Sequence, residues 1–115
     1  MALVDLAVAR QHCKAEAEDD AVLQVYLGAA EQHALDFLNR RVFATEQALD
    51  EAVVAETAGS APIVVNDAIR NAILLLCGHW YVNREDAVTG TIAQQVPMGA
   101  HELLRPHRHF PGVFE

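Results

Sequence analysis

Histidines near the carboxyl end are the first residues whose type and spacing could support chemistry. His107 and His109 form a His-x-His pair, and His101 lies six residues before it. Imidazole nitrogens bind zinc when three or four ligands converge with fixed geometry and outer hydrogen bonds hold them in place. These histidines stand beside Pro106, and no cysteine is near them in the sequence. We therefore expect no metal site and no cofactor.

Paired carboxylates are the next candidates, because two acids facing one substrate can perform acid–base catalysis. Asp19–Asp20 and Asp50–Glu51 are adjacent in the sequence, so on a helix they point to different sides. We expect them to be solvated surface charge. The sequence has no GxSxG, no phosphate-binding glycine loop and no HExxH, and we expect no enzymatic activity.

The two cysteines, Cys13 and Cys77, lack the CxxC spacing of a metal or redox motif. Both fall in segments with helical patterns. We interpret them as small buried hydrophobic residues rather than as a disulfide or a nucleophile.

Aromatic and charged residues meet abruptly in the stretch GHWYVNRED, residues 78–86. Trp80 and Arg84 are four residues apart on one helix face, and Tyr81 and Glu85 share the next. One interpretation is a solvated helix end with the tryptophan plugging the core. The other is a docking corner, since Trp, Tyr and Arg are enriched at interface hot spots. For the second interpretation the predicted subunit or partner interface is Leu75, His79, Trp80, Tyr81, Arg84 and Glu85.

Charge and hydropathy exclude several classes of protein. The 115 residues include 16 acidic and 8 basic side chains, for a net charge of −8. Such a chain does not suit general nucleic-acid binding or docking on an anionic membrane. The start, MALVDLAVARQ, lacks the pattern of a signal peptide, and AILLLCG is too short to cross a bilayer. We expect no membrane association and an assembly site in the cytoplasm.

The helices that must position the candidate residues can be predicted from the periodicity of the apolar residues. Apolar residues recur at three- and four-residue steps over segments 6–14, 21–39 and 46–56. Asp5, then Asp19 or Asp20, then Thr45 are the expected N-caps. A further helix ends near residue 84; whether it starts at Pro62 or is capped by Asn66 stays open.

This further helix is apolar almost all round its cylinder, which is typical of a helix buried on more than one side. It contains ILLLC at residues 73–77, centred on Leu75. One domain of this length cannot easily cover such a helix alone, so we expect a neighbouring subunit to cover part of it.

Beyond this helix the sequence predicts less regular structure. Residues 86–96 form a polar segment, which we expect to be an extended loop that contains at most a short strand. One helical turn over 100–105 is expected to stop at Pro106. The predicted fold class is all-α: a small bundle of about four helices with a long loop, forming a domain over 1–108, and a flexible carboxyl-terminal tail over 109–115.

The order of motifs in the second half resembles the small head–tail connector proteins of tailed bacteriophages. A proline, an Ala-Ile pair, an aliphatic run, H-W-Y-x-N-R-E, P-x-G and L-L-x-P-x-R follow one another as in that family. His107, where an aromatic residue is common, and the Ala-rich segment 44–58 depart from it. The matching residues are Pro62, Ala68, Ile69, Leu74, Leu75, Leu76, His79, Trp80, Tyr81, Asn83, Arg84, Glu85, Pro97, Gly99, Leu103, Leu104, Pro106 and Arg108.

The resemblance implies a structural virion protein located at the head–tail junction. It implies a homo-oligomeric ring of roughly a dozen subunits below the portal, a dodecamer, whose channel continues toward the tail and a downstream stopper protein. DNA passes through such a ring without specific binding, which agrees with the acidity. We expect the tail to dock on the portal through Arg108, Phe110 and Phe114.

An alternative function shares the same composition. A small helical regulatory or adaptor module that binds one protein partner, as a monomer or dimer, needs no ring. The mass of the protein in solution distinguishes the two.

Overall fold

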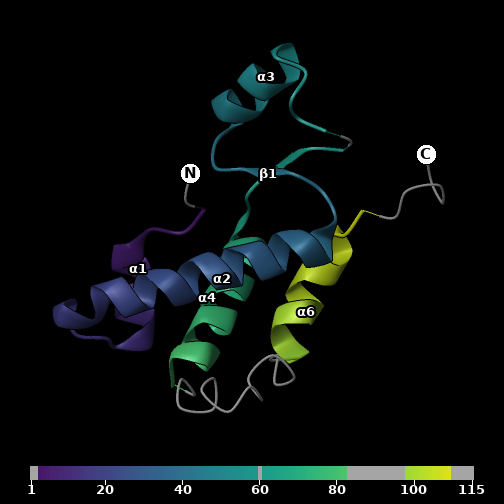
Figure 1. Ribbon diagram of the computed structural model, residues 1–115. Coiled ribbons are helices and arrows are strands. Elements are labelled where there is room, and N and C mark those ends of the chain that lie inside the picture. The colour runs from purple at the N-terminus through teal and green to yellow at the C-terminus, as the bar shows by residue number, and fades with distance from the viewer. Residues whose placement is uncertain (1–2, 60, 83–97, 110–115) are drawn as a thin grey trace.

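The described chain is a small helical bundle, as the sequence predicts. The structure is a computed structural model, and it describes residues 3–59, 61–82 and 98–109. Figure 1 shows how its elements are arranged. They are α1 (Leu6–Cys13), the 3-10 turn η1 (Ala17–Asp19), α2 (Asp20–Leu38), β1 (Val42–Phe43), α3 (Glu46–Val54), β2 (Ile63–Val64), α4 (Asp67–Val82), α6 (Met98–Leu104) and the 3-10 turn η3 (Arg105–His107).

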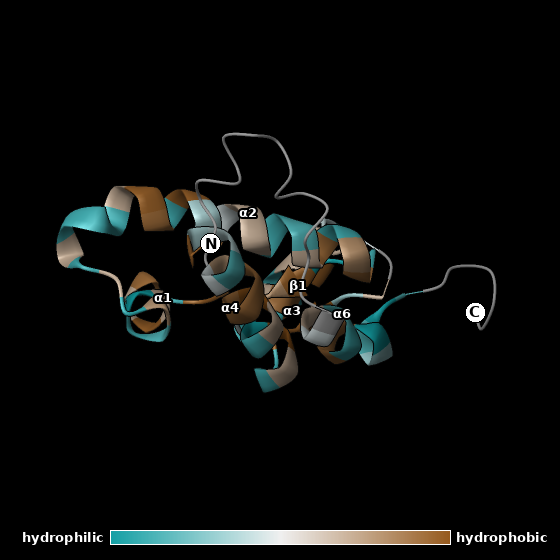
Figure 2. Ribbon diagram, turned by 90° about the horizontal axis from the view of Figure 1, so that it is seen from below, coloured by the Kyte–Doolittle hydropathy of each residue, from teal (hydrophilic) through white to brown (hydrophobic). Residues whose placement is uncertain are grey.

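The core lies where α4 crosses beneath α2, with α1 packed against both helices and α6 packed against α4. Hydrophobic colour is concentrated on α4 and on the strands next to it in Figure 2. Burying each large aliphatic side chain contributes about 1.5–3 kcal/mol. The largest fully buried side chains are Leu23, Leu27, Leu38, Ile69, Ile73, Leu76, Cys77 and Leu104.

Small residues let the helices approach closely. Four fully buried alanines, Ala9, Ala30, Ala34 and Ala72, lie on α1, α2 and α4. A Cβ added to Gly78 on α4 would lie 3.2 Å from the His12 Nε2 atom of α1. A side chain at this position would therefore force the His12 imidazole to shift by a few tenths of an ångström.

Two of the predicted N-caps make the expected hydrogen bond. The Asn66 Oδ1 atom accepts from the Ile69 backbone N–H at 2.9 Å, and Thr45 Oγ1 accepts from the Ala48 N–H at 3.1 Å. The start of α4 is thus set by Asn66 and not by Pro62. Asp5 and Asp19 occupy N-cap positions, but neither side chain makes a capping hydrogen bond.

A two-stranded parallel pairing, which the sequence analysis did not predict, interrupts the helical order. Val42 pairs with Ile63 and Phe43 with Val64. The chain between them, residues 44–62, carries α3 away from the other helices, and we call this segment the arm (Figure 1). None of the residues of α3 is buried.

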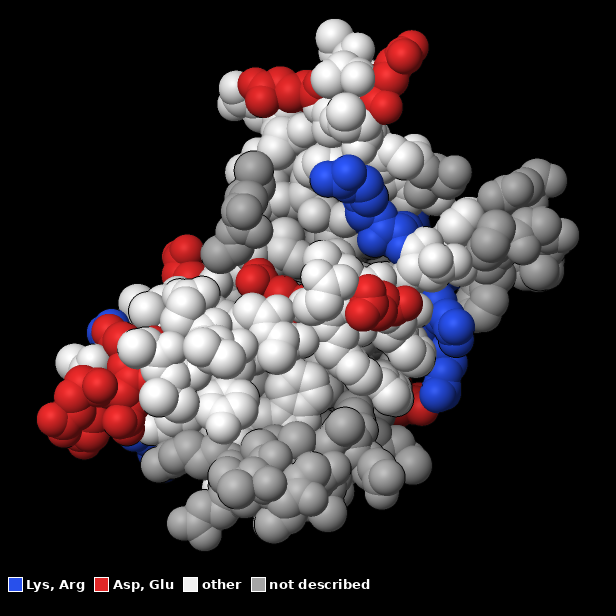
Figure 3. Space-filling model, in the orientation of Figure 1, with Lys and Arg blue, Asp and Glu red and all other residues white. Residues whose placement is uncertain are grey.

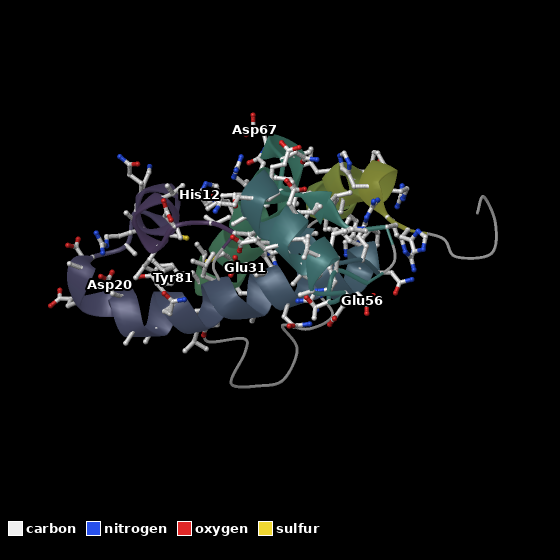
Figure 4. The ribbon with its side chains drawn as sticks, turned by 90° about the horizontal axis from the view of Figure 1, so that it is seen from above. His12, Asp20, Glu31, Glu56, Asp67 and Tyr81 are labelled. Atoms are coloured by element: carbon white, nitrogen blue, oxygen red, sulfur yellow. The ribbon has the colours of Figure 1, made fainter. Side chains whose placement is uncertain are left out.

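The amino-terminal segment is fixed to α2 by one carboxylate. Glu31 Oε1 accepts hydrogen bonds from the backbone N–H groups of Leu3 and Val4. Figure 4 shows Glu31 between α2 and the start of the chain. Both of the residues it holds are buried, so this contact positions the start of the chain against the bundle.

The carboxyl-terminal part is more regular than the sequence predicts. A seven-residue helix, α6, replaces the expected single turn, and Pro106 lies inside η3 instead of ending the helix. His109, the first residue of the predicted flexible tail, donates its backbone N–H to the Leu38 carbonyl at 2.8 Å. The predicted loop over 86–96 lies outside the described residues.

Candidate assembly surfaces

Both aromatic residues at the end of α4 point into the bundle. Trp80 is 9% exposed and Tyr81 is 8% exposed. The Trp80 ring packs edge-to-face with the imidazole of His33 on α2, with ring centroids 5.8 Å apart. In the isolated chain they act as core residues, which supports the first interpretation of this stretch. Arg84 and Glu85, the charged half of the predicted docking corner, lie outside the described residues.

Acidic residues at the start of α2 join three elements. The Tyr81 hydroxyl donates to Asp19 Oδ2 at 2.7 Å. Arg10 of α1 binds Asp20 through two N–H groups, at 2.8 and 2.5 Å, and this bond holds the pKa of the Asp20 carboxyl below its usual value. Figure 4 shows this corner. The prediction that these two carboxylates are only solvated charge is therefore wrong.

Most of the apolar surface of α4 is covered by its own chain. Leu74 and Leu75 are half-buried against the core, and Leu75 Cδ1 lies beside Gly99 of α6. Leu74, Leu75 and the exposed Val82 leave some apolar surface uncovered, so the expectation that a neighbouring subunit covers part of this helix stays a prediction. The large hydrophobic residues exposed elsewhere in the described chain are Val8, Val22, Val25, Val53 and Val54.

A row of planar side chains fixes α6 and η3 to α2. Phe37 stacks on His101 with ring centroids 4.5 Å apart, and the Arg108 guanidinium lies 5.0 Å from the centre of the Phe37 ring. A cation over an aromatic face is attracted to the ring's negative face. Arg108 is thus held against the bundle, while Phe110 and Phe114, the other predicted docking residues, lie outside the described residues.

His33 and His101 form a head-on pair. Their Nε2 atoms are 3.2 Å apart, closer than the ring centroids at 5.5 Å, and the ring planes differ by 9°. The two nitrogens therefore point at each other, and one proton between them makes an N–H···N bond. Burial, together with the charge that His101 carries when protonated, lowers the pKa of His33 against the opposing effect of Asp36.

Arg40 ties the arm to the carboxyl-terminal part. Its Nε donates to the Ala61 carbonyl at 2.6 Å, and its Nη1 donates to the His107 carbonyl at 3.0 Å. The next residue, Arg41, lies 5.5 Å above the centre of the Phe43 ring in β1. No motif in the sequence indicates this contact between distant segments.

The charged residues of the arm are all acidic. It carries Glu46, Asp50, Glu51 and Glu56, all exposed, and the sequence has no Lys or Arg from residue 42 to 69. In Figure 3 acidic side chains lie on the arm, and basic ones lie between the arm, the end of α2 and η3. This asymmetry was visible in the sequence, but the distance of the arm from the bundle was not.

The remaining candidates for chemistry do not converge. No group of three His, Cys, Asp or Glu residues with metal-binding spacing occurs within residues 3–59, 61–82 and 98–109. Cys77 is buried and Cys13 half-buried, and both are free thiols. Burial raises the pKa of Cys13 and raises that of Cys77 to about 12, so neither is poised as a nucleophile.

Comparison with known proteins gives one match. A family model described as phage gp6-like head-tail connector protein matches residues 4–108. No curated protein and no solved structure matches the chain. Among the described helices, none is long and apolar enough to cross a bilayer. The match spans nearly the whole chain, arm included, and this chain therefore belongs to the phage gp6-like head–tail connector family.

Proposed function

We propose that the protein is an adaptor that forms a ring under the portal of a tailed bacteriophage and extends the DNA channel toward the tail. The family match over residues 4–108 carries this proposal. The ring places each subunit between the portal above and a stopper or tail-completion protein below. Its working location is the head–tail junction of the virion.

The charge of the chain supports a conduit function. A net charge of −8 repels the phosphate backbone, so DNA can move through the ring without being held. A closed ring also needs two different complementary faces on each subunit. The acidic arm and the arginines at the end of α2 are two such faces on one chain.

The portal-binding role of the tail is tested by deleting residues 110–115. The deletion spares His109, whose backbone holds the end of η3 to α2, so the bundle should keep its thermal unfolding midpoint. We expect loss of co-sedimentation with portal rings of the same phage, because Phe110 and Phe114 are removed. Electron microscopy of the wild-type mixture should show an added ring. Undiminished binding by the shortened protein would contradict the tail assignment.

A second candidate function is a module that binds one protein partner as a monomer or dimer. The coverage of α4 by its own chain favours it, because the bundle needs no neighbour to bury its core. Light scattering at high protein concentration, with and without portal, separates the two candidates. A mass of one or two subunits in both samples would favour the module.

A further inference from the structure

The carboxylates of the arm find no cation among the residues that the structure describes. None of its four acidic side chains forms a salt bridge with any residue that the structure describes. By contrast, Asp20, Asp67 and Glu102 on the bundle are each paired with an arginine. The helix α3 is thus neither buried nor charge-neutralised by the described residues. Its exposed negative charge can bind a partner surface of positive charge.

Apolar residues accompany this charge on the arm. Val54 is 85% exposed and Val53 is 52% exposed, and both lie on the last turn of α3. Asp50 and Glu51 lie three residues before them on the same short helix. A partner surface for this helix must therefore offer apolar contact next to positive charge.

A groove on the same chain has this composition. It lies between the end of α2 and β1 and has a volume of about 450 Å³. Its apolar lining includes Leu35, Val42 and Phe43. Arg40 and Arg41 supply positive charge against the single carboxylate of Asp36. Arg41 is exposed, and its guanidinium is held over the Phe43 ring.

We propose that the arm of one subunit docks in this groove of a second copy of the same chain, with Val54 on the apolar lining and Glu51 beside Arg41. The contact is heterologous, because arm and groove are different surfaces. Such a contact, repeated from subunit to subunit, forms a ring where the rotation between neighbours closes. The inference rests on the proposed ring and specifies which surfaces form its subunit interface.

Charge complementarity supports a second copy as the occupant, because the acidic arm and the groove with Arg40 and Arg41 belong to the same chain. The arm is purely acidic, so it repels DNA. The groove and the arm occur once in every subunit, so each docking event leaves one free arm and one free groove for the next copy.

Charge reversal tests the contact. Glu51→Lys should abolish self-association in sedimentation velocity, and so should Arg41→Glu, because each places like charges together. The double variant E51K/R41E should restore association, since it re-forms the pair with reversed polarity. Glu18→Lys, an exposed acid in η1 at the far end of α2, is the matched control and should assemble normally. Circular dichroism confirms that each variant is folded.

Cross-linking on portal-bound rings tests the geometry directly. Subunits with Val54→Cys are mixed with subunits with Arg41→Cys and treated with a short bismaleimide. Any 54–41 product then joins two different chains. The native thiols react slowly because burial raises their pKa values. A cross-linked dimer is expected from the mixture, but not when Val25→Cys, an exposed position on α2, replaces V54C.

The outcomes separate this inference from the proposed function. Rings that form on the portal without the 54–41 product, or that form normally from E51K protein, would overturn the docking contact and leave the connector role intact. Wild-type protein that neither self-associates nor binds the portal would overturn both. Restoration by the double variant together with the cross-link would establish the contact.

Discussion

At the scale of single residues, side chains that join distant segments matter more than any catalytic group. Arg40 bonds the carbonyls of Ala61 and His107, which are 46 residues apart in the chain. Bonds from a charged donor contribute about 1.5–3 kcal/mol each. Arg40 therefore joins the base of the arm to the end of η3.

The His33–His101 pair makes stability depend on pH. Because the pKa of His33 is lowered from its ordinary 6.5 in the folded chain, the unfolded chain binds more protons below that pH. The free energy of unfolding is then highest above pH 6.5 and falls as the pH drops toward the folded pKa. We expect His33→Gln to flatten this slope between pH 7 and 5 in urea titrations followed by Trp80 fluorescence.

The control for this prediction is His12→Gln, which removes an exposed histidine of α1. It tests whether the loss of any histidine changes the dependence of the free energy of unfolding on pH. An unaltered slope in the H33Q protein would show that protonation of the pair does not weaken the attachment of α6. The acidic partner on the same helix, Asp36, opposes the shift, so Asp36→Asn should steepen the dependence.

At the scale of elements, helix ends depend on local hydrogen bonds whose donors and acceptors can be counted. Asn66 satisfies one of the free N–H groups at the start of α4 with a 2.9 Å bond, whereas Asp5 makes no such bond at the start of α1. Asn66→Ala should lower the free energy of unfolding by about 1 kcal/mol. Asp5→Ala, the matched control, should change it by only a few tenths. Equal losses in urea unfolding would contradict this assignment.

The helices were predictable because their apolar residues repeat with the helical period over eight or more residues. The pairing of β1 with β2 was not, because two-residue strands contain no alternation and their partners are 21 residues apart. The side on which Trp80 lies was also undetermined. A helix apolar all round has no unique buried face, and only the packing of α1, α2 and α6 decides which residues remain exposed.

At the scale of the whole molecule, a bundle that covers its own core carries an arm that contributes little to it beyond Ala44. The residues that fold the bundle are thus distinct from those proposed to join subunits. The helices α1, α2, α4 and α6 supply most of the buried residues, and α3 supplies none. The candidate interface predicted from the sequence placed the assembly surface at the end of α4. The described part of α4 turns Trp80 and Tyr81 inward, whereas Val53 and Val54 on the arm are exposed close to its carboxylates.

Replacing residues 45–58 with a short glycine–serine linker tests this division. The shortened protein should unfold cooperatively, with a free energy of unfolding within about 1 kcal/mol of the wild type, because α3 buries no residue and the one buried residue removed is the small Ala58. Shortening a loop also lowers the entropy cost of closing it. The protein should remain monomeric at concentrations where the full chain self-associates. A large loss of stability would place the arm in the folding unit, and continued association would show that subunits meet through another surface.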